Sequence, residues 1–406
     1  MKLIPFSPPR IDQKIIDEVI DTLKSGWITT GPKTKLFEKK LNEYYNSKAT
    51  LCLNSATAGL ELVLRWFGVG PSDEVIIPAY TYCATANVVL HCGAKPVMVD
   101  INHDDFNIST NHIKNAISDK TKVIIPVDIG GYPCDYDEIL SLINNPNIKK
   151  LFHPNTEIQR KLNRILLLSD AAHSLGAKYK GKKIGSMADV TVFSFHAVKN
   201  LTTAEGGAIA LNLPVPFSNE DIYKNLCIFS LHGQSKDALS KSQKGAWKYD
   251  VLEVGYKANM TDIQASIGLV ELKRYDKDTL KKRRHIFEYY QTEFSKYRWA
   301  MCPRWKSDDK TSSFHLYLLR IKDITEQQRD AIIEKIFEKN VSVNVHFQPL
   351  PMLSAYKNLG YDINNYPVAF NNYSQEISLP VFYDLTDAQL EIIVKAIVNS
   401  VNEIIK

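Results

Sequence analysis

Short apolar runs alternate with segments of helical patterning between about residues 75 and 211, and this alternation limits the possible folds more than any other feature. The runs are apolar throughout, as are strands buried on both faces of a mostly parallel sheet. The expected strands are "EVIIP", "KPVMVD", "TKVIIPVD", "RILLLSD", "DVTVFSF" and "GGAIAL". The sequence therefore predicts the α/β class, with a mostly parallel central sheet flanked by helices.

The pattern changes after Ile263, where helical residues to about 297 precede two short strands, "HLYLLRI" and "VSVNVHF". A last helix is expected from Thr386, because Thr386 and Gln389 match a capping box. Its core stripe would be Leu390, Ile393, Val394, Ile397 and Val401. We therefore expect a large α/β domain over 1–270 and a smaller α+β domain over 271–406.

Two further segments do not fit the alternating pattern, one before the block and one within it. The N-terminal segment "KIIDEVIDTLKSG" has an apolar helical face and ends at Gly26, where a helix C-cap glycine is expected. That face consists of Ile15, Ile16, Val19, Ile20 and Leu23. The stretch at 144–164 is polar and weakly patterned, which indicates a surface insertion before "RILLLSD".

Composition argues against several classes of protein. A formal net charge of +5 is mild, and the one dense basic cluster, "LKKRR", fits the solvated face of a helix, so no nucleic-acid partner is expected. The chain has no GxGxxG, P-loop, HExxH or EF-hand pattern, which gives a nicotinamide or metal site no support. No run of 18 apolar residues occurs, so no membrane association is expected. Six cysteines without a CxxC pair suit buried thiols in a reducing cytoplasm.

Three local patterns carry candidate chemistry, and each has a simpler explanation. "NSATAGLEL" opens a helix at about Thr57, where free N–H groups could hold a phosphate or the hydroxyl could only cap the helix. Asp170 ends a buried strand at the edge where α/β sheets bind ligands, but it could cap the next turn. His173 follows and could be a satisfied core histidine. Lys199 lies just beyond "DVTVFSF" and could reach solvent.

Taken together, the three patterns indicate pyridoxal phosphate. A lysine amine can bond the aldehyde of this cofactor as a Schiff base, and a helix N-terminus can hold its phosphate. The carboxylate of Asp170 would keep the pyridine nitrogen protonated, because an opposite charge favours the cationic form. Lys199 then becomes the candidate catalytic residue.

These residues lie in motifs of a known family. The chain resembles the DegT/StrS-type sugar aminotransferases, a branch of the fold-type I pyridoxal phosphate-dependent enzymes. The likeness covers nearly the whole chain. Its motifs are "SGWITTGPKT", "NSATAGLEL", "IPAYTYCATANVV", "SDAAHSLGA", "SFHAVKNLTTAEGGA", "GYKANMTDIQASIGLVEL" and "VHFQPL".

The resemblance implies roles around the cofactor ring. Lys199 would hold the cofactor and shuttle the proton, Asp170 would pair with the pyridinium, and Tyr82 would stack on the ring. His173 stands beside the phenolic oxygen, at a position where many members carry glutamine. Ser169 stands where a glutamate is usual.

It also implies how the phosphate is held. Thr57 and Ala58 would bind it largely through backbone N–H groups, together with Ser194. Asn259 would reach it from the neighbouring subunit, so a homodimer with shared active sites is expected.

For the substrate, the resemblance implies a nucleotide-linked keto sugar. Thr29, Thr30 and Gly31 would contact the hexose, and His346 with Phe347 would lie on the nucleotide side. The segment "LHGQSKDALSKSQKGAWKYDVLEVGYK" is similar to the subgroup that acts on 4-keto-6-deoxy sugars, often UDP-linked N-acetylhexosamine derivatives used for surface polysaccharides or glycans.

The expected reaction is a two-stage transamination, in which L-glutamate converts pyridoxal phosphate to pyridoxamine phosphate and the amine then passes to the sugar. A 3-keto sugar or a cyclitol is an alternative acceptor. Related sugar dehydratases carry histidine where Lys199 stands, and the lysine argues against that lyase chemistry. A non-catalytic cofactor-binding dimer is the remaining alternative, against which stand the matching cofactor positions.

Overall fold

The central sheet has the predicted α/β architecture. The computed structural model describes residues 3–236 and 248–405. Seven strands lie in the order β1-β9-β8-β5-β4-β2-β3. They are β1 Ala49–Leu53, β2 Glu74–Pro78, β3 Lys95–Val99, β4 Thr121–Ile124, β5 Leu166–Asp170, β8 Val190–Ser194 and β9 Gly207–Leu211. Only β9 pairs antiparallel, with β1 and β8, so the expectation of a mostly parallel sheet is confirmed.

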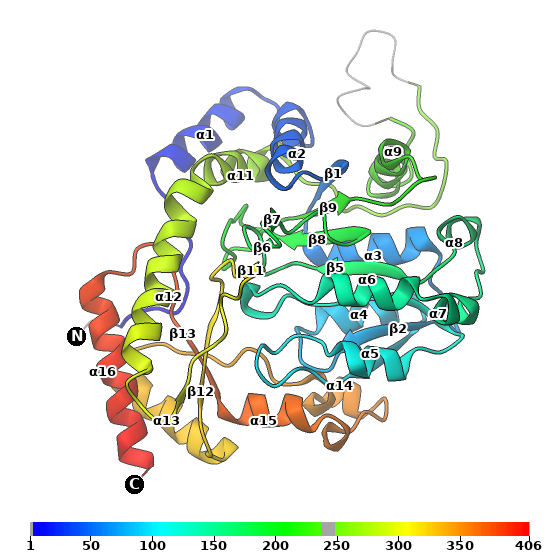
Figure 1. The fold of residues 1–406 in the computed structure, drawn as a ribbon. Coiled ribbons are helices and arrows are strands. Elements are labelled where there is room, and N and C mark those ends of the chain that lie inside the picture. The colour runs from blue at the N-terminus through cyan, green and yellow to red at the C-terminus, as the bar shows by residue number, and fades with distance from the viewer. Residues whose placement is uncertain (1–2, 237–247, 406) are drawn as a thin grey trace.

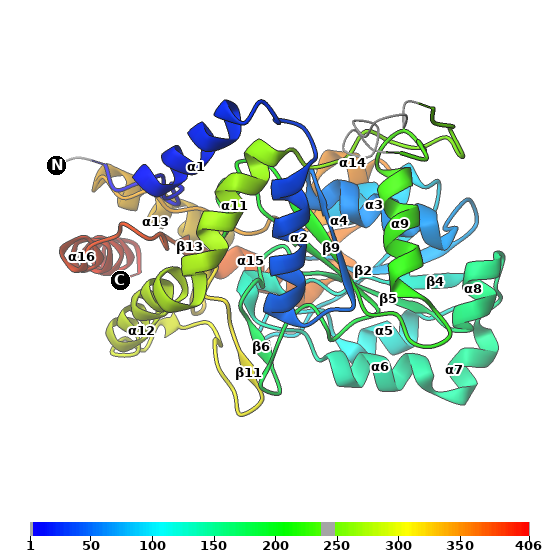
Figure 2. The same cartoon turned by 90° about the horizontal axis from the view of Figure 1, so that it is seen from above.

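Helices cover both faces of this sheet, which explains why its strands are apolar throughout. In Figures 1 and 2, α3 (Ala56–Phe67) and α4 (Ala84–His91) lie on one face, and α5 (Thr110–Ala116) and α6 (Tyr136–Asn144) on the other. Helices α2 (Pro32–Tyr45) and α9 (Asn219–Phe229) lie near β1. A small second sheet has the order β11-β6-β7, from Lys310–Thr311, Lys178–Tyr179 and Lys182–Lys183.

The C-terminal part begins with two helices in line. They are α11 (Asp262–Arg274) and α12 (Leu280–Phe294), joined by a π-helical turn over Tyr275–Thr279. A three-stranded sheet follows, ordered β10-β12-β13. The remaining elements are β10 Ala300–Met301, β12 Tyr317–Ile321, β13 Glu376–Leu379, α13 Glu326–Glu338, α14 Ser354–Lys357, α15 Pro367–Gln375 and α16 Asp387–Ile404.

Two expectations for this part have different outcomes. Thr386 and Gln389 make both bonds of the capping box at the start of α16, and the predicted core stripe is buried, so this helix is confirmed. The strand expected at "VSVNVHF" is wrong, because the segment forms only single bridges. Val341 bridges Ile4 on one side and Asn344 bridges Ser378 on the other, so no continuous ladder develops.

Buried apolar side chains form two clusters. One surrounds the central sheet, and the other lies among α12, α13, α16 and the strands β12 and β13. The second cluster also contains Ile4, while Leu350 and Tyr373 belong to the first. Segments from both ends of the sequence therefore cross between the clusters, and the division of the chain at residue 270 stays a prediction.

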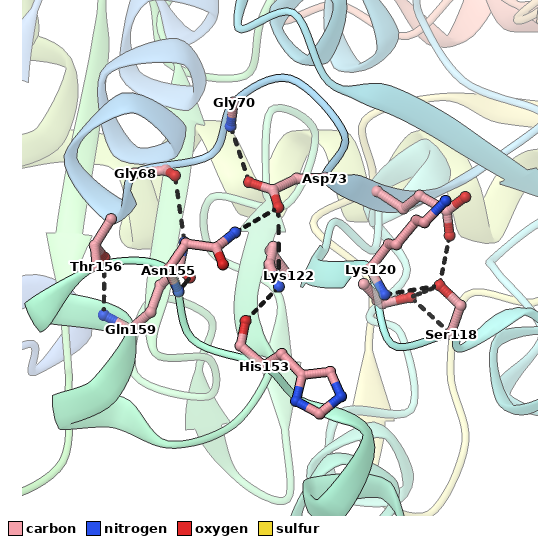
Figure 3. A network of polar contacts seen from close by, with 12 residues as sticks. Gly68, Gly70, Asp73, Ser118, Lys120, Lys122, His153, Asn155, Thr156 and Gln159 are labelled. Carbon is pink, nitrogen blue, oxygen red and sulfur yellow. Dashed lines mark hydrogen bonds and ion pairs between the residues drawn. The ribbon is translucent and has the colours of Figure 1, made fainter.

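The stretch at 144–164 is more ordered than its polar sequence indicated. It contains α7 (Pro146–Leu151) and α8 (Glu157–Leu162), and a buried polar network anchors it (Figure 3). The Lys122 ammonium donates to the His153 carbonyl at 2.5 Å and lies 3.8 Å from the Asp73 carboxylate. Gln159 is fully buried and donates to the carbonyl of Phe67 at 3.0 Å, at the end of α3. The stretch therefore lies at the surface as expected, but it is ordered and has a buried anchor.

The N-terminal helix α1 spans Gln13–Lys24, and Gly26 follows it with a φ of 73°, in the left-handed region that favours glycine. Within the apolar face of α1, Ile15 is buried, but Ile16, Ile20 and Leu23 are exposed. These three side chains of the face therefore have no full cover among the described residues of one chain. Among the described helices, none is both long and apolar enough to cross a membrane.

Replacing Gln159 with alanine tests the anchor of residues 144–164. Because the Phe67 carbonyl and the Asn155 N–H lose a buried partner, we expect Gln159→Ala to destabilise the protein by about 2 kcal/mol. Urea unfolding followed by circular dichroism measures the change. The matched control is Lys150→Ala on exposed α7, which should stay within about 0.5 kcal/mol of wild type. Equal effects of the two substitutions would contradict the anchoring role.

Candidate active site

A cavity of about 460 Å³ lies at the carboxyl ends of the central parallel strands. Asp170 ends β5 and Ser194 ends β8, so the parallel pairing of these two strands places both residues at one edge of the sheet. This is the edge at which open α/β sheets bind ligands. Eight of the predicted site residues line the cavity: Thr57, Tyr82, Asp170, His173, Ser194, Lys199, His346 and Phe347.

Lys199 lies in the loop that connects β8 to the antiparallel strand β9. Its backbone N–H donates to the His196 carbonyl at 2.9 Å, which fixes the turn that carries the side chain. Loss of water around the amine lowers the pKa of Lys199 to about 8, although the charge of Asp170 acts in the opposite direction. A lowered pKa gives the amine a larger neutral fraction, which both covalent bonding and proton transfer require.

The carboxylate of Asp170 has two defined partners. Thr85 Oγ1 donates to Asp170 Oδ2 at 2.9 Å, and the Ala172 N–H donates to Oδ1 at 3.2 Å. The second bond is the turn cap that was the simpler explanation for this residue. Burial raises the pKa of Asp170, while these two bonds and the Lys199 ammonium lower it. The carboxylate thus caps its turn and also lines the cavity.

His173 lies in a group of stacked rings rather than in a satisfied core position. Its ring is stacked on Phe347, with centroids 5.7 Å apart, and it lies 4.4 Å from the ring of His315. Burial lowers the pKa of His173 far below its usual value, so the ring is neutral. Its Nδ1 is buried and has no hydrogen-bond partner among the described residues. Tyr82 is exposed beside this stack, and its ring centroid lies 6.0 Å from that of Phe347.

The N-terminus of α3 closes another side of the cavity. Ser55 is its N-cap and accepts the Ala58 N–H at 3.1 Å, so this N–H already has a partner within the chain. Thr57 lines the cavity, and Ala58 is not among the described lining residues. Strand β9 passes so close that a Cβ at Gly207 would lie 2.5 Å from the Ala56 nitrogen. Glycine at 207 therefore allows the loop after Lys199 to return directly beside this helix end. The phosphate-binding role of Ala58 stays a prediction.

Four other predicted residues form a hydrogen-bonded cluster that is not part of the described lining of the cavity in the same chain. Asn259 Nδ2 donates to Thr30 Oγ1 at 2.6 Å, and Thr30 Oγ1 donates to the Met260 carbonyl at 2.5 Å. The Asp262 N–H donates to the Thr29 carbonyl at 3.1 Å, and the Gly31 N–H donates to Asp262 Oδ1 at 2.8 Å. None of Thr29, Thr30, Gly31 and Asn259 is among the described residues that line the cavity.

Several residues that line or support the cavity were not predicted. Phe6 and Ser7 reach it from the N-terminus, and Ser7 Oγ donates to the Val198 carbonyl at 3.4 Å. His315 reaches it from the segment before β12, where it lay hidden at the start of the apolar run "HLYLLRI". Thr85 lies within the quoted motif "IPAYTYCATANVV", and that motif was the available signal for its position.

The comparisons with known proteins identify the family. Residues 9–152 and 156–398 match the DegT/DnrJ/EryC1/StrS aminotransferase family. The chain belongs to this family.

Individual relatives of this chain are described as sugar aminotransferases or as proteins of polysaccharide biosynthesis. A putative sugar aminotransferase from Streptococcus pneumoniae, Spr1654 in its PMP form, is 46% identical with a TM-score of 0.95, over 99% of this chain and 100% of that one. The spore coat polysaccharide biosynthesis protein SpsC of Bacillus subtilis is 36% identical, over 97% of this chain and 96% of SpsC. Helicobacter pylori PseC, an aminotransferase involved in the biosynthesis of pseudoaminic acid, is 28% identical with a TM-score of 0.85, over 99% and 100% of the two chains.

Membership confirms the predicted fold-type I architecture and the class of a pyridoxal phosphate-dependent aminotransferase. The residues of this chain suit the cofactor. Lys199 supplies an amine of lowered pKa, Asp170 a buried carboxylate and His173 an unpartnered ring nitrogen.

The lowered pKa of Lys199 predicts how the cofactor-free protein takes up pyridoxal phosphate. Because the neutral amine reacts, the rate should rise about tenfold per unit of pH below 8 and then level off. Stopped-flow absorbance of the bound cofactor measures this rate, with Lys199→Arg as the control, since a guanidinium stays protonated. A rate in the wild type that keeps rising to pH 10 would mean that burial does not lower the pKa of this amine.

Proposed function

We propose that this sugar aminotransferase moves an amino group from L-glutamate to a nucleotide-linked keto sugar. The proposed acceptor is a UDP-linked 4-keto-6-deoxy-N-acetylhexosamine, used for a surface polysaccharide or glycan. The observation that carries the proposal is the lysine amine of lowered pKa beside a buried carboxylate in one cavity. Relatives with roles in polysaccharide and pseudoaminic acid biosynthesis support a sugar acceptor. Of the motif that indicates the 4-keto-6-deoxy subgroup, residues 237–247 lie outside the described part of the chain.

The chain's own residues would divide the work as follows. Bound pyridoxal phosphate supplies an electron sink that stabilises negative charge on the carbon next to the transferred nitrogen. Asp170 would hold a proton on the pyridine nitrogen, and the Thr57 N–H with Ser194 would hold the phosphate. Tyr82 would lie against the ring. His173, whose ring is neutral, would contact the phenolic oxygen through a ring nitrogen.

Lys199 Nζ would move the proton. Transamination needs a base that removes a proton from one carbon and returns it to another, and an amine with a pKa near the working pH can do both. Partial burial among His173, His346 and Phe347 keeps water from the amine. A guanidinium at this position could not accept a proton, so Lys199→Arg should not transaminate.

We also propose that two chains share their active sites. Asn259 and Thr30 are hydrogen-bonded to each other outside the cavity of their own chain. Large apolar side chains are exposed near them on α1, on α2 and on the loop between these helices, which suits a face covered by a second copy. They are Ile16, Ile20, Leu23, Ile28 and Leu36. In such a dimer, Asn259 would reach the phosphate of the neighbouring site, and Thr29, Thr30 and Gly31 would contact its hexose.

Isotope transfer tests the proposed reaction. Purified protein with pyridoxal phosphate and nitrogen-15 L-glutamate is offered UDP-, dTDP- and GDP-linked 4-keto-6-deoxy sugars, and products are identified by mass spectrometry. We expect labelled amino sugar from a UDP-linked N-acetylhexosamine, and none with Lys199→Ala. If glutamate changes the cofactor spectrum but no panel member is labelled, the acceptor is a 3-keto sugar or a cyclitol. If glutamate leaves the spectrum unchanged, the proposed amino donor is wrong.

Subunit mixing tests the shared sites. Asn259→Ala and Lys199→Ala should each be inactive alone, but a mixed dimer contains one site with both residues intact. Random exchange should restore about a quarter of wild-type activity, because half of the dimers are mixed and one of their two sites works. Two aliquots of Lys199→Ala mixed in the same way serve as the control. No recovery, with exchange verified by a mass tag, would place Asn259 in the site of its own chain.

A further inference from the structure

His346 is held by hydrogen bonds to its backbone and its ring and by a stacked aromatic ring. The backbone N–H of His346 donates to Glu376 Oε2 at 3.1 Å, and Tyr80 Oη donates to the backbone carbonyl of His346 at 2.5 Å. Its Nδ1 lies 3.0 Å from Ser378 Oγ, and Phe6 stacks on the ring with centroids 5.4 Å apart. The opposite ring nitrogen, Nε2, has no partner among the described residues, and the ring lines the cavity. Ser378 therefore occupies Nδ1, and Nε2 remains available to a ligand in the cavity.

Glu376 stands behind this arrangement on β13. Its side chain is fully buried, and Ser378 Oγ lies 2.6 Å from Oε1. Within the described chain it makes no ion pair with Arg320 or Arg329, whose hydrogen bonds go to backbone carbonyls, Asn372 and Asp330. A buried carboxylate without a paired cation favours its neutral form.

The charges around Glu376 lead to the same conclusion. The charged and titratable groups that face it are Arg320, Arg329, Tyr80 and His346. Burial raises the pKa of Glu376 to about 8, although Ser378, the His346 N–H and the two arginines lower it. Burial also lowers the pKa of His346 to about 4, so this ring is neutral throughout the working range of pH.

These contacts allow two arrangements of hydrogen atoms. With Glu376 neutral, Oε1 donates to Ser378 Oγ, the serine hydroxyl donates to His346 Nδ1, and the ring hydrogen lies on Nε2. With Glu376 ionised, the two hydrogen bonds of Ser378 Oγ reverse: His346 Nδ1 donates to the hydroxyl oxygen, and the hydroxyl donates to Glu376 Oε1. His346 Nε2 then has only a lone pair. Because a neutral histidine has one N–H, the state of Glu376 decides whether the cavity meets a donor or an acceptor.

We propose that Glu376, acting through Ser378, is a positioning residue that keeps the hydrogen of His346 on Nε2, so that this nitrogen donates to an anionic oxygen of the substrate. The inference rests on the proposed function, since it assumes that aminotransferase substrates occupy the cavity. The described lining contains no arginine, so anionic oxygens there depend on Lys199, hydroxyl groups, backbone N–H groups and histidines. The oxygen belongs either to the carboxylate of the amino donor or to the diphosphate of the sugar.

Nitrogen-15 NMR of ring-labelled histidine in the holoenzyme tests the tautomer without any substrate. The His346 signals are assigned by their loss in His346→Gln. At pH 6.5 we expect the hydrogen on Nε2, and at pH 9.5 on Nδ1. Glu376→Gln should keep Nε2–H at both values, because its neutral amide still donates to Ser378. Hydrogen on Nδ1 at pH 6.5, or a wild-type pattern in Ser378→Ala, would overturn the proposal.

Half-reaction kinetics identify the oxygen. Ser378→Ala should raise the KM of one substrate about tenfold, whereas Glu376→Gln at pH 6.5 should stay within about twofold of wild type. A higher KM for glutamate assigns the oxygen to the carboxylate, and a higher KM for the sugar assigns it to the diphosphate. The matched control is Ser374→Ala, which removes the hydroxyl of a different buried serine, on α15 instead of β13. Unchanged KM values for both substrates in Ser378→Ala would overturn the proposal. Failure of the isotope assay with the NMR result intact would overturn only the proposed function.

Discussion

Removing the Lys199 amine from water while leaving it reachable is the constraint on which the rest of the site depends. A lysine on an ordinary surface loop stays protonated, and neither bonds an aldehyde readily nor accepts a proton. Here the turn after β8 places the amine over a cavity walled by aromatic and imidazole rings, and its pKa falls to about 8. Among the described residues, the carboxylate that opposes this shift is Asp170, at the end of the adjacent parallel strand. The fold therefore places the reactive amine and its carboxylate at one edge of the central sheet.

The same edge explains the less regular features of the fold. In the central sheet as described, the strand that pairs antiparallel with its neighbours, β9, turns the chain back beside β8 and brings Gly207 against the start of α3. The N-terminal segment crosses from the second apolar cluster, where Ile4 is buried, to the rim of the cavity, where Phe6 stacks on His346. Glu376 and Ser378 act from the far side of that ring. The apolar walls of the site thus come from the first cluster, and the second cluster supports His346 only from behind, through Ser378 on β13 between Ile377 and Leu379.

How much the sequence could predict depended on whether the signal was local. Buried parallel strands and the Thr386 capping box are encoded in short runs, and both were predicted correctly. The segment at 144–164 lies at the surface as predicted, but its anchor could not be foreseen, because the partners of the buried Gln159, the carbonyls at the end of α3, are far away in sequence. Single bridges at Val341 and Asn344, and the contacts of Phe6 and His315 with the cavity, depend on tertiary packing in the same way. Two strand ends and a helix start indicated Lys199, Asp170 and Thr57 as cofactor residues, and the motif resemblance added Tyr82, Ser194 and Asn259, which periodicity alone could not have assigned.

Covalent trapping tests the central claim most directly. Holoenzyme is reduced with borohydride, digested, and searched by mass spectrometry for the peptide that carries the pyridoxyl group. The account predicts one label, on Lys199 in "SFHAVKNLTTAEGGA", and its absence after prior conversion with glutamate. A label on another lysine, or none while the cofactor remains bound, would contradict it.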